Sequence, residues 1–386
     1  MSQYLVKIKP IEQFFFGVEK IGNLGNRKSY FLQTAEFPQQ TSILGLLRHI
    51  LLLNIENKNL PELIGEQSFS SDNKNGYGII ENISPVFIID KNNVHFFIQP
   101  SDWQFQYVEN HLNCKTSYGV NKKDFIPQLS GYDAKKSIEP YLIGSNGDSV
   151  PLWYNSKTGK GVLRKCVNPG TQKNPERFIE NDDENSDEDK NAAKKEAFYL
   201  QEFLYMEKEY SYACLVSLNT SDDTDKILKE HNAVVPFGGE RSAFQITFEK
   251  IDEHVLVKDY INNKQCKRAC WKIELLSDAY VSSEILKFTS FAISDSVGFR
   301  YINTTIKTEN YSKILTKQEK MEKQKESGGL GKHAYFSNQF QLLKRGSVLF
   351  FSLEKDMQEA ERLLDSEECS AYKNIGYNYY RKIIIT

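Results

Sequence analysis

The sequence predicts an α+β protein with two ferredoxin-like (RRM-like) units that carry large insertions. Three observations predict this fold class. Apolar residues alternate in several short runs typical of strands, and others recur at helical spacing. The order strand, helix, strand occurs in both halves of the chain. The 386 residues also exceed what one compact core usually holds, which favours two domains.

The first unit begins with an alternating strand over residues 4–9, which Pro10 ends. A helix over residues 41–52 follows, with Thr41 or Ser42 as its cap. One face of this helix is apolar and consists of Ile43, Leu46, Leu47, Ile50 and Leu51. Two β-rich runs, 85–90 and 94–99, flank a short Asn turn and predict a hairpin.

A strand over residues 212–218, a helix over 222–230 capped by Ser221, and an alternating strand over 244–248 complete this unit. Between the two groups of elements, residues 101–200 are rich in Asn, Lys, Gly and Asp, with scattered aromatics such as Trp153 and Tyr154. We expect this stretch to be an insertion with little core of its own.

The second unit starts with a strand over residues 270–276. Residues 336–353 predict one long strand or a bent pair, 356–365 an amphipathic helix, and 376–385 a final strand. A Lys-rich loop spans 307–332. The predicted domains are therefore 1–255, with an insertion over about 100–205, and 266–386.

The charge is unevenly distributed. The net charge is −2, from 49 basic and 51 acidic residues, whereas the run 180–189 holds seven acids and no base. Removing these seven acids leaves a mildly basic remainder of +5. A protein that binds duplex DNA alone is usually more basic. The distribution favours a protein that grips a short RNA within a larger assembly, with the acidic run as a separate loop.

The cysteines and the N-terminus indicate the cytoplasm. The six cysteines are sparse for a chain of this length and suit a reducing compartment. No apolar run follows a basic segment at the start, so we expect no signal peptide and no membrane partner. Cys266 and Cys270 are four apart, but no second pair follows at zinc-site spacing, so we expect no metal and no cofactor.

Catalysis has little support in the sequence. None of the six histidines lies in an HExxH, HD or HxH arrangement, and His49 falls on the apolar helix, where a structural role is expected. His333 follows Gly331 and Lys332, and would be the best general base if the chain were a ribonuclease. We therefore expect no enzyme activity.

Glycine next to cations is the more informative pattern. It occurs in GNLGNRKS, PFGGERS, SGGLGKH and KRGSV, none of which matches a Walker loop. Glycine lets backbone N–H groups approach a phosphate, and Arg or Lys adds charge. The alternative for each segment is a tight turn with solvated charges.

Two further features suit RNA. The start of the helix after Gln39 and Gln40 offers backbone N–H groups and a favourable dipole to a phosphate, and Arg48 could reach the same surface or pair with a loop. Tyr377, Tyr379 and Tyr380 lie on the predicted last strand. Aromatic rings on such a strand can stack on bases, although neighbouring residues face opposite ways.

Four motifs together resemble a known family. FPQQTSILGLLRHILL (37–52) resembles the early helix of the RAMP superfamily of CRISPR proteins. PFGGERSAF (236–244), KRGSVLFF (344–351) and IGYNYY (375–380) resemble segments of the third-subunit family of the type III-B (Cmr) CRISPR effector complex. The chain departs from the family at Ser242, where a second basic residue is common, and at Gln39 and Gln40, where a second proline is common.

The resemblance implies two ferredoxin-like RAMP domains without a nuclease site. It implies that the chain holds the repeat-derived 5′ handle of the guide crRNA, beside a large polymerase-like subunit and other RAMP subunits, and meets target RNA indirectly. A thumb-like hairpin is expected within residues 100–205.

From the motifs and the resemblance together we expect the following residues to bind RNA: Asn26, Arg27, Lys28, Gln40, Thr41, Ser42, Arg48, Gly238, Gly239, Glu240, Arg241, Ser242, Lys344, Arg345, Gly376, Tyr377 and Asn378. Two alternatives stay open at this point: a guide-processing endoribonuclease of the same superfamily, and a scaffold that binds only protein.

Overall fold

The computed structural model describes residues 2–18, 31–55, 60–71, 76–102, 104–108, 111–115, 119–120, 127–128, 140–171, 198–251, 270–304 and 334–385. The predicted loops at 180–189 and 307–332 lie outside these residues, as do Cys266 and His333.

The larger sheet is antiparallel and contains the first predicted strands. Its strand order is β11-β10-β5-β4-β14-β1-β16-β15, and β3 also pairs with β14. The strands are β1 (Ser2–Pro10), β3 (Ile80–Ile83), β4 (Phe87–Asp90), β5 (His95–Ile98), β10 (Tyr141–Gly144), β11 (Ser149–Pro151), β14 (Tyr210–Leu218), β15 (Asn232–Pro236) and β16 (Ala243–Ile251). The predicted strands at 4–9, 212–218 and 244–248 and the hairpin at 85–99 are confirmed.

Helices α1 (Gln40–Asn54) and α4 (Asp222–Lys229) pack on one face of this sheet. The alternating side chains of β1 meet the apolar face of α1 that the sequence predicts, and every member of that face is buried. Gln39, rather than Thr41 or Ser42, is the N-cap of α1, so the predicted cap is wrong by two residues. Ser221 caps α4 as predicted, and the short helix α2 (Leu60–Ile64) follows α1.

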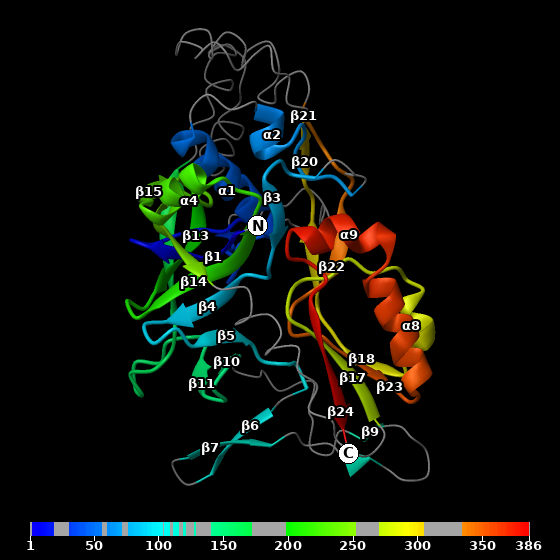
Figure 1. Ribbon diagram of the computed structural model, residues 1–386. Helices are drawn as coiled ribbons and strands as arrows, with labels where there is room; N and C mark the ends of the chain where they lie inside the picture. The colour runs from blue at the N-terminus through cyan, green and yellow to red at the C-terminus, as the bar shows by residue number, and fades with distance from the viewer. Residues whose placement is uncertain are drawn as a thin grey trace, which may run out of the picture.

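The second sheet has the strand order β18-β23-β17-β24 and is also antiparallel. Its strands are β17 (Cys270–Leu275), β18 (Phe291–Ile293), β23 (Val348–Phe351) and β24 (Tyr380–Ile385). Helix α6 (Ile285–Phe288) follows β17, and α8 (Glu354–Leu364) and α9 (Glu367–Asn374) follow β23. Figure 1 shows α8 and α9 beside this sheet, and Met357, Ala360 and Leu364 of α8 are buried against it.

Smaller sheets complete the molecule. A three-stranded sheet joins β12 (Leu163–Thr171), β13 (Phe198–Met206) and β2 (Phe31–Leu32). Four two-stranded pairs are β6 (Gln104–Val108) with β7 (His111–Lys115), β8 (Gly119–Val120) with β9 (Pro127–Gln128), β19 (Ser296–Phe299) with β22 (Phe340–Leu343), and β20 (Ile302–Thr304) with β21 (Ala334–Phe336).

Two sequence expectations need correction. Part of residues 101–200 belongs to the core, because β10 and β11 extend the larger sheet and Leu142, Leu152 and Leu163 are buried. The final strand starts only at Tyr380, because residues 376–379 form a turn. Residues 336–353 are a bent pair, as one of the two alternatives predicted, with β22 and β23 in different sheets.

The two halves share one continuous core. Phe69 of the first half lies within 5.1 Å, between ring centroids, of Tyr372 on α9. The side-chain amide of Gln40 donates to the carbonyls of Ser84 (2.8 Å) and Ile375 (2.9 Å), so the first residue of α1 is tied to the second half. A Cβ on Gly376, whose φ is +97°, would lie 1.6 Å from the Gln40 amide nitrogen, so only glycine fits there.

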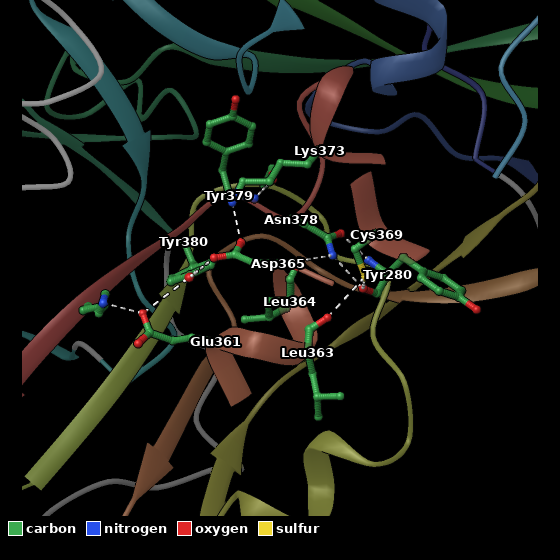
Figure 2. Close-up of polar contacts among 12 residues, drawn as sticks. Tyr280, Glu361, Leu363, Leu364, Asp365, Cys369, Lys373, Asn378, Tyr379 and Tyr380 are labelled. Atoms are coloured by element: carbon green, nitrogen blue, oxygen red, sulfur yellow. Dashed lines mark hydrogen bonds and ion pairs between the residues drawn. The ribbon is translucent and has the colours of Figure 1, made fainter. Parts of the chain in front are cut away.

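Figure 2 shows how the turn after Gly376 is held. The Asn378 side chain accepts from the Tyr280 amide and donates to the Tyr280 carbonyl, both at 2.8 Å. The Tyr380 hydroxyl donates to Asp365 at the end of α8. The Asn378 bonds satisfy a buried side chain, and the more exposed Tyr380 bond fixes the start of β24 against α8.

A buried charge network lies where the segment after β5 meets the second sheet. The Lys272 ammonium lies 2.6 Å from the Asp102 carboxylate and 2.5 Å from that of Glu274, and all three side chains are almost fully buried. Arg381 of β24 also pairs with Glu274. The two carboxylates and two cations balance, as buried charges require.

We predict that Gly376→Ala destabilises the fold by about 3 kcal/mol. The new methyl group must displace the Gln40 amide, and the alanine backbone must adopt a left-handed conformation. Denaturant unfolding of the purified chain measures this. Gly45→Ala is the control: a Cβ there meets nothing within 4 Å, so alanine should raise helix stability by up to about 1 kcal/mol. Equal stability of the two variants would contradict the close packing of Gly376 on the Gln40 side chain.

Asp225 of α4 gives a pH-dependent contribution to stability. Its carboxylate accepts from the Tyr4 hydroxyl (2.6 Å), the Ser2 hydroxyl (2.9 Å) and Thr220, and it pairs with Lys250. Burial alone would raise the pKa of Asp225, but these donors outweigh it and hold the pKa well below its usual value. The stabilisation is therefore complete above pH of about 4 and is lost as the pH falls further.

We predict that Asp225→Asn lowers the free energy of unfolding by about 2 kcal/mol at pH 7, since a charge-assisted network is lost. The wild-type chain should lose that advantage as the pH drops below about 4, whereas the variant should change less. Urea titrations between pH 3 and 7 test this, with the nearby exposed Glu230→Gln as control. Parallel pH profiles for wild type and Asp225→Asn would refute it.

Candidate nucleic-acid interface

A hollow of about 460 Å³ lies between the first turns of α1 and the loop that joins β15 to β16. It is lined by Phe16, Gly17, Pro38, Gln39, Ser42, Gly45, Leu46, His49, Pro236, Phe237, Gly238, Gly239 and Arg241. Ser42, Gly45 and His49 recur every three or four residues, so they form one stripe of α1 that faces the hollow. None of the described residues that line it is Asp or Glu.

Close packing shapes the glycine loop. Gly238 has a φ of +80°, and a Cβ there would lie 2.6 Å from the Phe15 carbonyl oxygen. The Gly239 amide donates to that same carbonyl at 2.8 Å. The Ser242 hydroxyl donates to the Gly239 carbonyl (3.1 Å), which closes the loop. Both glycines are needed because the loop lies directly on residues 15 and 16.

Glu240 and Arg241 follow in an uncommon backbone conformation. Both have a positive φ, +55° and +53°, which costs a non-glycine residue about 1 kcal/mol or more. Both side chains are exposed, and the Arg241 guanidinium makes no hydrogen bond or ion pair with any of the described residues. The loop therefore presents at the edge of the hollow a cation that no described residue neutralises.

The positive end of the α1 dipole points to the same place. Gln39 caps the helix without a side-chain hydrogen bond, and no acid lies in the first turn. Tyr377 is buried, and burial raises the pKa of its hydroxyl. Thr41 lies near that hydroxyl, whereas Ser42, the next residue of the first turn, lines the hollow. An anion in the hollow would meet the favourable end of a 15-residue helix.

The structure thus brings together part of the predicted RNA-binding set. Ser42, Gly238, Gly239 and Arg241 line one hollow, and Glu240 lies in the same loop. Ser242 is buried beneath that loop, where it holds the loop closed. Gln40 is fully buried, and its amide bonds are those that join the two halves.

Arg48 does not reach the hollow. Its guanidinium donates to the Gln67 carbonyl at 2.7 Å and lies over the Tyr77 ring, 5.2 Å from the centroid. Of the two roles weighed for Arg48, the structure therefore shows contact with a loop, not with the helix start.

The cations of the KRGSV segment lie elsewhere. Arg345 is buried, donates to the Val86 carbonyl at 3.1 Å, and stacks over the Phe37 ring. Lys344 is more exposed and lies 3.7 Å from the Glu36 carboxylate. Arg345 therefore ties the halves together, and only Lys344 has a side chain open to solvent.

The C-terminal motif is also internal. Tyr377 and Asn378 are fully buried, and Gly376 packs on Gln40. The contacts of these residues are within the protein, and the side chains of Tyr377 and Asn378 have no surface that RNA could reach in this structure. Asn26, Arg27 and Lys28 lie outside the described residues.

Some lining residues escaped the sequence analysis. His49 was expected to be structural, but it is exposed at the edge of the hollow. Gly45, Phe16 and Pro38 were not predicted to belong to a site. The spacing of Ser42, Gly45 and His49 on one helical stripe was the signal that could have found the helix side of the hollow.

No group of three or more His, Cys, Asp or Glu side chains that could hold a metal ion occurs among the described residues. Within the same ranges, no helix is both long and apolar enough to cross a bilayer.

Comparison with known proteins adds the family. A model of the family described as CRISPR-associated protein (Cas_Cmr3) matches residues 6–383. The match spans almost the entire chain and so places it among CRISPR-associated proteins. The chain belongs to the Cas_Cmr3 family, which confirms the resemblance drawn from its four motifs. No curated protein is similar enough to this chain to count as a match.

Solved structures show more distant similarity. A chain of the type III-B Cmr-beta complex bound to cognate target RNA has 14% identity, with 97% of this chain and 96% of that chain covered and a TM-score of 0.45. A chain of the type III-A Csm3–Csm4 subcomplex has 11% identity, with 90% and 94% covered and a TM-score of 0.36. The family assignment rests on the family model and not on these likenesses.

Proposed function

We propose that this chain is a non-catalytic RNA-binding subunit of a type III-B CRISPR effector ribonucleoprotein, and that it holds the repeat-derived 5′ handle of the guide RNA. The observation that carries the proposal is the convergence of the unpaired Arg241, the glycine loop and the start of α1 on one hollow. Family membership supplies the CRISPR context.

The hollow suits a phosphate. An unpaired guanidinium can donate two parallel hydrogen bonds to phosphate oxygens. The glycine loop lets backbone approach closely, and the dipole of α1 adds positive potential. Because the described lining residues include no carboxylate, an anion in the hollow meets repulsion only from Glu240 in the neighbouring loop position among the residues that the structure describes.

The walls also suit an unstacked base. Phe16, Leu46 and Phe237 give an apolar lining, whereas Gln39, Ser42 and His49 supply polar groups. Sites of roughly 300–1,000 Å³ with such a mixture are typical of small-molecule pockets. Single-stranded RNA offers splayed bases of this kind, and duplexes do not.

We propose that two ferredoxin-like domains carry this site, over residues 1–255 and 266–386. The strand orders support this: β4-β14-β1-β16 and β18-β23-β17-β24 have the same sequence-to-space order, second, third, first, fourth. In each, one helix or more connects the first strand to the second and the third to the fourth. The insertion over about 100–205 interrupts the first domain.

The non-catalytic role is favoured by the chemistry of the hollow. Among the described lining residues His49 is the single histidine, and none of them supplies a carboxylate that could orient it as a general base. The ribonuclease alternative depends on His333, which lies outside the described residues. Incubation of the purified chain with repeat RNA separates the two, since site-specific cleavage lost in His333→Ala would favour the enzyme.

The proposed partners follow from the family. We propose that the chain docks the large polymerase-like subunit and other RAMP subunits in the cytoplasm, and that target RNA reaches it through the guide. Cys166, Cys214 and Cys369 are free thiols, which suits a reducing compartment.

We predict that Arg241→Glu reduces guide RNA retained by the co-expressed, purified complex by about tenfold, because a charge-assisted contact becomes repulsive. Quantifying guide RNA per mole of complex measures this. Arg362→Glu, at an exposed arginine on α8, is the matched control and should retain the guide fully. Retention by Arg241→Glu equal to the control would exclude this site.

We predict that Gly45→Phe also reduces guide retention several-fold, because its ring would enter the hollow. A Cβ at Gly45 meets no atom within 4 Å, so the fold should stay intact. Gly45→Ala should retain the guide almost fully, since a methyl group fills little of the hollow. A complex of Gly45→Phe with normal guide content would show that RNA does not use the hollow.

A further inference from the structure

A stacked pair of side chains lies outside the hollow. The guanidinium carbon of Arg164, at the start of β12, is 3.6 Å from the centroid of the Tyr154 ring. In the plane of the guanidinium, its Nε lies 2.5 Å from the Glu207 carboxylate. The ring fixes one face and the carboxylate one edge. The Arg164 side chain is 48% exposed, so solvent or a ligand can reach the guanidinium beyond these two contacts.

Further cations surround this pair. The Lys165 ammonium lies 4.4 Å from the centroid of the Trp153 ring, and it pairs with Glu202 at 3.3 Å. Lys157 and Lys160 lie on the tight turn between these segments, are exposed, and form no ion pair with the described part of the chain. They carry the uncompensated charge of this surface.

The turn holds these lysines in place. The Asn155 amide donates to the Lys160 carbonyl at 2.8 Å, and the Asn155 side chain accepts from the Lys157 amide at 2.9 Å. The two charges are therefore presented on a defined turn instead of a long loop. Phosphates along an RNA strand can therefore bind the two lysines without further ordering of the protein backbone.

One face of the β12–β13 hairpin connects this surface to the hollow. Arg164 is paired with Tyr205, and two residues further along the strand Cys166 is paired with Phe203 on the same face. The Phe203 ring is 6.0 Å from the Phe15 ring, and the Phe15 carbonyl accepts from the Gly239 amide. Half-buried aromatic rings thus line the route from Arg164 to the glycine loop.

We infer that this Arg164 surface, defined as Trp153, Tyr154, Lys157, Lys160, Arg164 and Lys165, binds a second segment of single-stranded RNA. This rests on the proposed function, since that segment continues the strand held in the hollow. One base stacks on the face of the Arg164 guanidinium opposite Tyr154, as bases do on arginine planes in RNA complexes. Lys157 and Lys160 contact the neighbouring phosphates.

The chemistry favours RNA over an acidic peptide. A peptide carboxylate would bind an edge of the guanidinium, and Glu207 already takes the Nε side of it. A nucleobase instead needs a face, and Tyr154 covers only one of the two. Glu202 and Glu207 neutralise Lys165 and Arg164 but not the two turn lysines, so phosphates still meet a net positive charge.

Arg164→Lys tests the stacking directly. Lysine keeps the charge and can still pair with Glu207, but it has no plane for a base. Fluorescence anisotropy of a labelled single-stranded repeat RNA with the full chain should show binding about fivefold weaker. The slope of log Kd against log salt should stay unchanged, which a general structural defect would not produce.

The double variant Lys157→Gln/Lys160→Gln tests the phosphate contacts. Each phosphate contact to single-stranded RNA contributes about 0.7 to the salt slope, so the slope should fall by about 1.4. Lys355→Gln, at an exposed lysine of α8, is the control and should match wild type. Thermal unfolding of each variant verifies the fold.

Arg241→Glu, measured alongside, separates the two sites. Weaker binding by both Arg241→Glu and Arg164→Lys supports the Arg164 surface. Weaker binding by Arg241→Glu alone, with Arg164→Lys and the double lysine variant within twofold of wild type, overturns it and leaves the proposed function standing. If none of these variants binds RNA more weakly than the control, both proposals fail.

Discussion

The hydrogen bonds of the Gln40 side chain join the two halves of the chain beside the start of α1. One amide group, on the first residue of α1, donates to carbonyls that come from both halves of the chain. The turn at Gly376 has room for it because glycine has no side chain. The start of α1, and with it one wall of the hollow, is therefore anchored to the second half as well as to the first.

The predictability of the fold from sequence differed with the kind of element. Alternating or helical apolar patterns identified β1, β14, β16, α1 and α8, because burial of one face leaves a direct trace in residue order. The long strand β12 and the short strands β15 and β18 carry no such trace. β12 contains Asn168, Pro169 and Gly170, which read as a loop, but pairing with β13 makes the segment a strand. Tertiary contact there outweighs local preference.

The candidate site shows the same division. PFGGERS was recognised because two glycines near a cation indicate a backbone in close contact with another group. In the structure, Phe15 of the protein itself makes such a contact. Arg48 and Arg345 were predicted to bind RNA from their charge, although the sequence does not show where each side chain points. Both guanidiniums turn inward, onto Tyr77 and Phe37 respectively. Sequence composition cannot distinguish a cation that anchors a loop from one that is open to a ligand.

The charge network at Lys272 has a consequence for the modularity of the chain. Asp102 is fixed on Lys272, and the Gln99 amide donates to the Tyr141 carbonyl at 2.9 Å, so the residues before and after the segment 103–139 already meet. Closing that gap with a brief linker would therefore cost little chain entropy. Exchange of this segment for a shorter or longer one should therefore leave its two flanks in place, because Asp102 and Gln99 are held by residues outside it.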